Sequence, residues 1–210
     1  MNPSISTLNQ LVLATGNLGK LREMQALLQG LNIKVSPQSD YHVSECPEPH
    51  CTFIENSLAK ARHASRMTRL PALADDSGLC VMALQGAPGV LSARYACEND
   101  HDQKSDAANN AKLLQALIMQ ENRHAYYYCV MVLVRYANDP QPLISEGVWT
   151  GEILREARGE GGFGYDPLFL DDKTGQTVAE LAPAIKNRIS HRGQAMHKLL
   201  LKLENMQHGE

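Results

Sequence analysis

Two adjacent carboxylates, Asp75 and Asp76, follow the apolar run 70–74 and precede Ser77 and Gly78. We expect the apolar run to form a buried strand and the Ser-Gly pair to turn the chain. Both acids would then lie at a strand tip, where α/β sheets bind ligands. Neighbouring carboxylates repel each other, so the pair costs stability unless a cation shares the site. Mg²⁺ prefers hard oxygen ligands and is the cation that this chemistry favours. A plain surface turn is the alternative, because all four residue types are common in turns.

A second segment has the form of an anion-binding turn between a strand at 11–15 and a helix at about 19–29. A glycine-containing turn of this kind directs backbone N–H groups and the positive end of the helix toward an anion. The segment is not a nucleotide-binding P-loop, because Leu21 stands where that motif needs Ser or Thr. An ordinary strand–turn–helix connection is the alternative. The candidate anion-binding residues are Thr15, Gly16, Asn17, Leu18, Gly19 and Lys20.

A third segment, 161–167, combines three glycines with two aromatic residues. Glycines such as Gly164 let the backbone approach a ligand closely. Phe163 and Tyr165 can stack on a nucleic base, and Asp166 can accept a hydrogen bond from a base N–H. The segment therefore predicts a base-binding loop, with a purely structural loop as the alternative.

Basic residues occur at two further places that could face a ligand. Lys60 lies in a helix expected over 52–68, and Lys186 precedes His191 and Arg192 in the first turn of a last helix. Cations in a first turn oppose the helix dipole. A bound ligand would offset this locally unfavourable choice. Solvated basic surfaces are the alternative at both places.

The composition excludes several classes of protein. The 210 residues are 43% hydrophobic and 20% charged, with a net charge of −3, so no global basic field attracts nucleic acid or an anionic membrane. No apolar run approaches the roughly 20 residues of a membrane span, and the polar start carries no basic region typical of a signal peptide. Five cysteines without a C-x-x-C pair indicate a reducing, cytoplasmic compartment. The cluster Cys46, His50 and Cys51 does not fit the usual zinc spacing.

The remaining pattern predicts an α/β fold with a mixed, twisted β-sheet and flanking helices. Strands are expected at 11–15, 32–36, 70–74, 79–84, 126–136, 143–149, 152–158 and 168–170. Helices are expected at 19–29, 52–68, 106–121 and from about 190.

The sequence predicts which face of two of these helices is buried. Thr52 and Glu55 form a capping box at the start of one helix. Its inward residues are expected to be Ile54, Leu58, Ala61, Ala64 and Ser65. An apolar stripe on the last helix is interpreted as core or as a subunit interface, and consists of Met196, Leu199, Leu200, Leu203 and Met206.

Together these segments resemble the inosine triphosphate pyrophosphatase family of the Ham1/RdgB type, over residues 11 to about 200. Each motif is short, but six of them in order at fitting separations are highly specific. The motifs that carry the resemblance are Ala14-Thr15-Gly16-Asn17 with Lys20 and Glu23, Thr52-Phe53-Ile54-Glu55-Asn56 with Lys60-Ala61, Ala74-Asp75-Asp76-Ser77-Gly78-Leu79, Gly86-Ala87-Pro88-Gly89 with Ser92-Ala93-Arg94-Tyr95, Gly161-Gly162-Phe163-Gly164-Tyr165-Asp166-Pro167, and Ser190-His191-Arg192-Gly193.

The resemblance implies hydrolysis of deaminated purine nucleoside triphosphates (ITP, dITP and XTP) to the monophosphate and pyrophosphate. It also implies Mg²⁺, a homodimer, and one domain over 1–210 with two lobes around a central cleft. Segments 1–9 and 207–210 are expected to be flexible.

By the same resemblance, Asp76 is the general base and shares metal binding with Glu48 and Asp75. The substrate-binding residues that the resemblance implies are Thr15–Lys20 and Lys60 for the phosphates, Ser77, and for the purine Phe163, Gly164, Tyr165, Asp166, Lys186, His191 and Arg192.

One departure from the family pattern affects the metal site. His50 stands where the family has a glycine, so we expect strain at His50 if that position has a positive φ. Glu45 is then the alternative to Glu48 as a metal ligand. The rival functions are a broader nucleoside triphosphate pyrophosphatase and a nucleotide sensor without turnover; a sensor would not need the acid pair.

Overall fold

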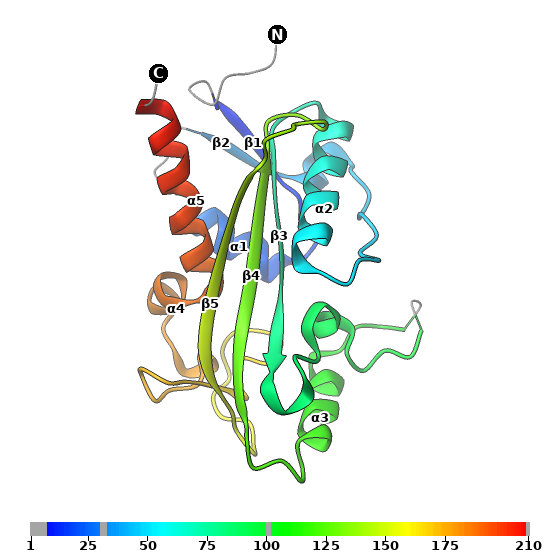
Figure 1. The fold of residues 1–210 in the computed structure, drawn as a ribbon, viewed down its shortest axis with the longest axis vertical. Coiled ribbons are helices and arrows are strands. Elements are labelled where there is room, and N and C mark those ends of the chain that lie inside the picture. The colour runs from blue at the N-terminus through cyan, green and yellow to red at the C-terminus, as the bar shows by residue number, and fades with distance from the viewer. Residues whose placement is uncertain (1–7, 30–32, 100–101, 209–210) are drawn as a thin grey trace. The chain divides into compact units, whose positions relative to one another are not determined.

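The computed structural model describes residues 8–29, 33–99 and 102–208. Its described strands form a mixed six-stranded sheet in the order β2-β1-β3-β4-β5-β6 (Figure 1). The pairs β1–β2 and β1–β3 are parallel, and β5–β6 is antiparallel. This confirms the predicted fold class. The strands are β1 Gln10–Leu13, β2 Lys34–Pro37, β3 Ala72–Val81, β4 His124–Val134, β5 Leu143–Ile153 and β6 Phe169–Asp171. The α-helices are α1 Leu18–Leu27, α2 Phe53–Thr68, α3 Asp106–Ala116, α4 Pro183–Ile189 and α5 His191–His208.

The chain divides into two compact units, with three boundaries inside the long strands β3, β4 and β5 and a fourth between His191 and Arg192 at the start of α5. The first unit comprises 1–76, 129–147 and 192–210, and the second comprises 77–128 and 148–191.

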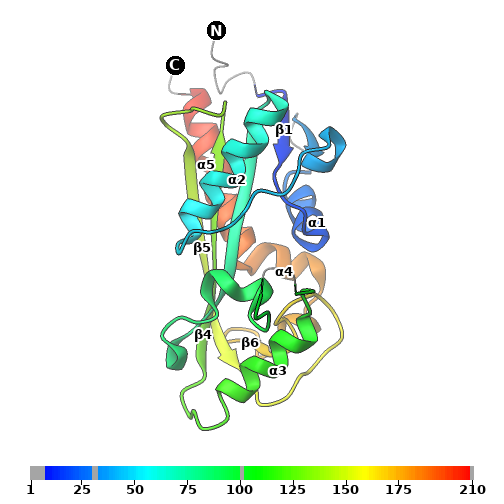
Figure 2. The same ribbon diagram turned by 90° about the vertical axis from the view of Figure 1, so that its right-hand side faces the viewer.

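The first unit is built on the parallel strands β1, β2 and β3. Helices α2 and α5 cover opposite faces of these strands (Figures 1 and 2). Side chains alternate between the faces of a strand, so Leu11, Leu13 and Leu73 pack in one core with α1 and α5. Within α5, four residues of the predicted stripe belong to this core: Met196 and Leu199 are fully buried, Leu203 is nearly so, and Leu200 packs against them. The side chain of Met206 lies outside the described part of the structure.

The second unit has a separate core made by α3, β6 and the adjoining parts of the long strands. Tyr127 packs on Phe169 with ring centroids 4.7 Å apart. The indole N–H of Trp149 donates to Asp171 Oδ1 at 2.6 Å, which satisfies the polar atom of a buried aromatic residue.

Strand β3 corrects the prediction that Ser77 and Gly78 turn the chain. The strand runs without interruption from Ala72 to Val81, so the two acids lie inside it and not at its tip. Gly78 is a glycine for another reason: a Cβ there would collide with the carbonyl oxygen of Gly89 and with Ser92 Oγ. A glycine inside a strand often marks such a close approach.

Strand β5 corrects a second break of the same kind. The sequence predicts separate strands at 143–149 and 152–158, but one strand spans Leu143–Ile153. Gly151, at the predicted break, faces Leu170 O and the Phe169 ring, where a Cβ would not fit.

The helix predictions need smaller corrections. Helix α3 begins at Asp106 as predicted but ends at Ala116, and the short helix α4 was not predicted. Ile54, predicted to face inward on α2, is 41% exposed. Three buried residues of α2 are polar, and two of them, Asn56 and Ser57, are overlooked by an argument from apolar periodicity.

Some predictions fall partly outside the described residues. Segment 1–7 of the expected N-terminal extension lies outside them, whereas Leu8 is buried in the core of the first unit. Residues 30–32, which the sequence places at the end of a helix and the start of a strand, also lie outside them, as do 209–210. Within the described residues, no helix has the length and apolarity needed to cross a membrane.

The turn between β4 and β5 is held by Asp139, whose carboxylate is fully buried. It accepts hydrogen bonds from Arg135 Nε at 2.8 Å and from the backbone amides of Arg135 and Gln141, both at 3.0 Å. Burial raises the pKa of Asp139, but these hydrogen bonds outweigh it and lower the pKa to about 2. The ionised carboxylate therefore stabilises the folded chain.

We expect Asp139→Asn to lower the free energy of unfolding at pH 7 by about 2 kcal/mol. A depressed pKa contributes stability above the unfolded value near 3.8, and this contribution is lost as the pH falls toward 2. Urea unfolding of both proteins between pH 7 and pH 2.5 measures the difference. The gap should narrow below pH 4, and a gap that stays constant down to pH 2.5 would contradict the assignment.

Candidate active site

The predicted anion-binding residues lie together at the start of α1. Asn17 is the N-cap of this helix, and its Oδ1 accepts a hydrogen bond from the amide of Lys20 at 3.0 Å. Thr15 Oγ1 accepts one from the amide of Asn17 at 3.2 Å. Gly16, Asn17 and Leu18 are exposed, and Leu18 and Gly19 begin the helix. The start of α1 thus forms an accessible turn, as an anion site requires.

Asp75 lies on the face of β3 that packs against α1 and α5. Its side chain is fully buried, and its Oδ2 lies 3.2 Å from Lys20 Nζ and 3.2 Å from Arg192 Nη2. Arg192 also pairs with Glu23 on α1. Burial raises the pKa of Asp75, but Lys20 and Arg192 outweigh it and hold the pKa well below its usual range. Asp75 is therefore ionised, with two cations on one oxygen.

Asp76 lies on the opposite face of β3, toward α2. Its Oδ2 accepts a hydrogen bond from Asn56 Nδ2 at 3.1 Å, and its Oδ1 lies 3.6 Å from Lys60 Nζ. Burial raises the pKa of Asp76, and the attraction of Lys60 and Lys20 offsets this only in part. The two adjacent acids thus have opposite pKa directions, because strand alternation gives each a different set of partners.

Glu48 joins the Asp76 side through Lys60. Its Oε1 lies 2.6 Å from Lys60 Nζ, so a single ammonium group lies between two carboxylates. Burial lowers the pKa of Lys60, but Asp76, Asp75 and Glu48 outweigh it and raise the pKa.

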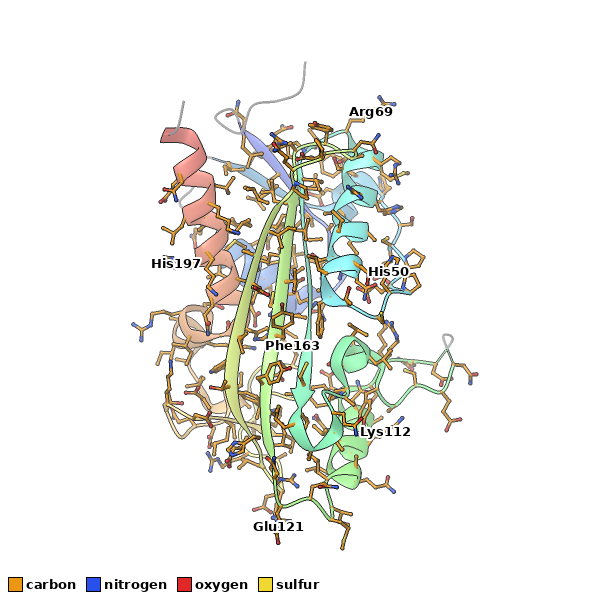
Figure 3. All side chains as sticks on the ribbon, in the orientation of Figure 1. His50, Arg69, Lys112, Glu121, Phe163 and His197 are labelled. Carbon is orange, nitrogen blue, oxygen red and sulfur yellow. The ribbon has the colours of Figure 1, made fainter. Side chains whose placement is uncertain are left out.

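His50 does not carry the strain expected of it. The described non-glycine residues with positive φ are His42, Arg69 and Gln85. His50, beside the start of α2 (Figure 3), exchanges backbone hydrogen bonds at 3.1 Å with the amide group of Asn56. Asn56 therefore connects the loop that carries Glu48 to the carboxylate of Asp76.

The donor set suits a hard divalent cation. Among the described residues, no three His, Cys, Asp or Glu side chains gather as a complete metal cage. Mg²⁺ does not need one, because it is usually held by one or two carboxylates together with water and substrate phosphates. Glu48 and Asp76, which share the ammonium of Lys60, supply such a pair. Glu45 instead lies against Gly16, where its Oε1 leaves no room for a Cβ.

Most of the predicted base-binding residues lie in the second unit, which holds the buried Asp166, whereas Arg192 lies in the first unit. Asp166 Oδ2 accepts hydrogen bonds from Lys186 Nζ at 2.7 Å and from the amide of Phe163 at 2.9 Å. The Lys186 ammonium lies 4.6 Å from the centre of the Phe163 ring, labelled in Figure 3. Gly162 has φ +80°, and a Cβ there would collide with Asp166 Oδ2. The loop thus presents a half-buried aromatic ring in a fixed position.

Tyr165 and His191 lie in the core of the second unit. The Tyr165 hydroxyl donates to Ser92 O at 2.8 Å, and burial raises its pKa. The His191 ring stacks on Tyr127 with centroids 4.7 Å apart. Tyr165 is 3% exposed and His191 is 5% exposed. Both side chains therefore pack beneath the loop 161–167 and present little surface to a ligand. Ser77, which is half-buried, is the first residue of this unit.

Sequence reasoning missed three contributors to the two carboxylate environments. Asn56 contacts Asp76, and Glu23 contacts Arg192. Cys129 Sγ lies 3.9 Å from Asp75 Oδ2, and burial and the Asp75 charge raise its pKa to about 12. Asn56 and Glu23 carry a usable signal, because Asn56 lies one helical turn before Lys60 and Glu23 one turn after Lys20.

Comparison with known proteins agrees with this arrangement. Residues 11–202 match the family model described as the Ham1 family. The chain is 61% identical over 196 residues to a dITP/XTP pyrophosphatase of Chromobacterium violaceum, covering 93% of this chain and 98% of that protein. It is 58% identical over 195 residues to one of Burkholderia pseudomallei, covering 93% of each. The solved structure of a HAM1 protein from Coxiella burnetii is similar with a TM-score of 0.85 and 50% identity, over 93% of this chain and 98% of that one. The chain therefore belongs to the Ham1 family.

Proposed function

We propose that this protein hydrolyses deaminated purine nucleoside triphosphates (ITP, dITP and XTP) to the nucleoside monophosphate and pyrophosphate. The observation that carries the proposal is the pair of adjacent acids in β3. Asp75 is neutralised by Lys20 and Arg192, while Asp76 lies beside Lys60 and Glu48. A sensor without turnover would have no use for the second acid. The dITP/XTP pyrophosphatase activity named for the relatives supports the same reaction.

The first unit supplies the groups that bind the triphosphate. A triphosphate resists attack because its own charge repels a nucleophile, so catalysis depends on offsetting that charge. The turn Thr15–Lys20 donates hydrogen bonds to phosphate oxygens through backbone amides other than those of Asn17 and Lys20, which donate within the turn. Lys20 and Lys60 add positive charge. Both lysines are largely buried, with side chains 15% and 12% exposed, so water screens them weakly.

Asp76 acts as the general base and accepts a proton from the water that attacks the α-phosphorus. Glu48 and Asp76 would hold Mg²⁺, which when bound supplies further charge to stabilise the departing pyrophosphate. Asp75 contributes to metal binding in the sequence-based assignment. Its ion pair with Lys20 gives Asp75 a second role, which is to hold the Lys20 ammonium in position.

The second unit supplies the groups that recognise the purine. Phe163 stacks on the base, and Gly164, Asp166, Lys186 and His191 of the same unit frame it. Inosine and xanthine carry a 6-oxo acceptor where adenine carries an amino donor. A site that donates hydrogen bonds to this oxygen leaves adenine unmatched, and such sites reject mispaired analogues strongly.

A pyrophosphate-release assay with dITP tests the proposal. With Mg²⁺ present, we expect kcat/KM for dITP and XTP to exceed that for ATP and dUTP by at least about 10²-fold. Similar rates on dITP, GTP and dUTP would instead support the rival broad-specificity pyrophosphatase. Binding of dITP without release of pyrophosphate would support a sensor.

Removal of the divalent cation is expected to abolish turnover. Treatment with excess EDTA should lower the rate by about 10³-fold or more, because metal charge stabilisation amounts to several kcal/mol. Re-addition of Mg²⁺ should restore activity, and melting curves should show that the chain stays folded throughout. Full activity in EDTA would contradict the metal assignment.

We also propose a cytoplasmic homodimer, as the family resemblance implies. All five cysteines are free, which fits a reducing compartment. Sedimentation equilibrium at micromolar concentration would reveal the oligomeric state, and a monomer at all concentrations would reject the dimer.

A further inference from the structure

Helix α3 holds both backbone polar groups of Gly164. Asp106 Oδ2 accepts a hydrogen bond from the Gly164 amide at 2.6 Å, and Asn110 Nδ2 donates one to the Gly164 carbonyl at 3.1 Å. Asp106 and Asn110 are four residues apart, so they share one face of the helix and reach the glycine together. These three residues belong to the second unit.

Packing does not impose the conformation of Gly164. Its φ is +64°, a region that glycine enters freely, and a Cβ at this position would meet no atom within 4 Å. A glycine in open space can adopt many backbone conformations. The two hydrogen bonds from α3 are therefore the contacts on Gly164 that select this one.

The hydrogen bond from Asn110 to Gly164 comes with a desolvation penalty on the other half of the Asn110 amide. Within the described residues, its buried Oδ1 atom accepts no hydrogen bond, so half of the amide is desolvated without compensation. A buried polar atom in this state calls for an explanation. The hydrogen bond to Gly164 provides one, because it secures the loop in which Phe163 lies.

Phe163 is anchored from both of its neighbouring sides. Its own amide is held by Asp166, and the next residue, Gly164, is held by Asp106 and Asn110. The ring position under Lys186 depends on the backbone between these two anchors. Loss of one helix contact would leave only one polar group of Gly164 held by α3, and the ring could then rotate away from the position it needs for stacking.

We propose that Asp106 and Asn110 are positioning residues that determine recognition of the purine base of 6-oxopurine nucleotides. They act through the Gly164 backbone on the Phe163 ring and do not touch the base themselves. The inference rests on the proposed function and adds to it two residues of α3 that set substrate affinity.

The test compares Asp106→Ala and Asn110→Ala with the conservative variant Asp106→Asn, whose amide oxygen can still accept from Gly164. Gln115→Ala, an exposed position on the same helix, is the matched control. For each protein, KM and kcat are measured with dITP and Mg²⁺. The inhibition constant of pyrophosphate, a ligand without a base, is measured beside them.

We expect each alanine variant to raise KM for dITP about tenfold, as the loss of one well-placed hydrogen bond implies, with kcat changed less than about threefold. The inhibition constant of pyrophosphate should stay constant. Asp106→Asn should recover most of the KM, and Gln115→Ala should match the wild type.

Two results would overturn the inference. An unchanged KM in both alanine variants would show that α3 does not position the loop. A parallel rise of KM and of the pyrophosphate inhibition constant would show general structural damage instead. The wild-type assay separates this inference from the function beneath it, because a wild type that releases no pyrophosphate from dITP rejects the proposed function itself.

Discussion

Replacing Asp76 with asparagine is expected to lower kcat for dITP by about 10²–10⁴-fold while the chain stays folded. Asparagine keeps the size of the side chain and an oxygen that can accept the hydrogen bond from Asn56. What it loses is the ability to take a proton from water. Steady-state pyrophosphate release measures the change, and the melting temperature checks the fold.

The matched control is Asp172→Asn, an exposed carboxylate on the surface of the second unit. It should retain wild-type kcat, which excludes a general effect of removing one negative charge. If Asp76→Asn keeps more than about a tenth of wild-type kcat, Asp76 is not the general base.

Replacing the neighbouring Asp75 with asparagine is expected to damage stability first. Removal of one partner from a buried ion pair costs about 3–5 kcal/mol, because the remaining charge is left desolvated. Here two cations, Lys20 and Arg192, would lose the same oxygen. The free energy of unfolding, from urea titration at pH 7, should fall by that amount.

Asp76→Asn provides the comparison for Asp75→Asn within the same strand. We expect Asp75→Asn to be less stable than Asp76→Asn by at least about 2 kcal/mol in unfolding free energy. The difference arises because Asp75→Asn leaves two buried cations without their carboxylate partner. Equal stability of the two variants would mean that the Asp75 ion pairs contribute little, and the assignment of a supporting role to Asp75 would be withdrawn.

Sequence patterns predicted features of the site that depend on residues close together in the chain. Thr52 caps α2 as predicted, and this cap depends on residues a few positions apart. The fold class followed from the same kind of evidence, because hydrophobic periodicity marks strands and helices.

Long-range pairing escaped prediction. Arg192 meets Asp75 across 117 positions, and nothing near either residue identifies its partner. Sequence reasoning placed Arg192 with His191, since the two are adjacent, but the structure assigns them to different units. Adjacent residues at a helix start point in different directions, so adjacency is a weak guide to shared function.

Two glycines, Gly78 and Gly151, account for the wrong predicted boundaries of strands β3 and β5. The sequence predicts a turn at Gly78 and separate strands on either side of Gly151, whereas each glycine lies within a strand where another part of the chain comes too close for a side chain. Composition alone cannot separate these two uses of glycine, because the deciding atoms, Gly89 O and Leu170 O, come from elsewhere in the chain.

The alternation of side chains along β3 also limits how this segment can vary among related proteins. A single residue inserted or deleted between Ala72 and Asp75 would reverse the sides toward which both acids project. Asp76 would then project toward Arg192, and Asp75 toward Asn56. Substitutions at Ala72, Leu73 and Ala74 would leave this register intact, whereas length changes would not, so alignments of active homologues should be free of gaps across this stretch.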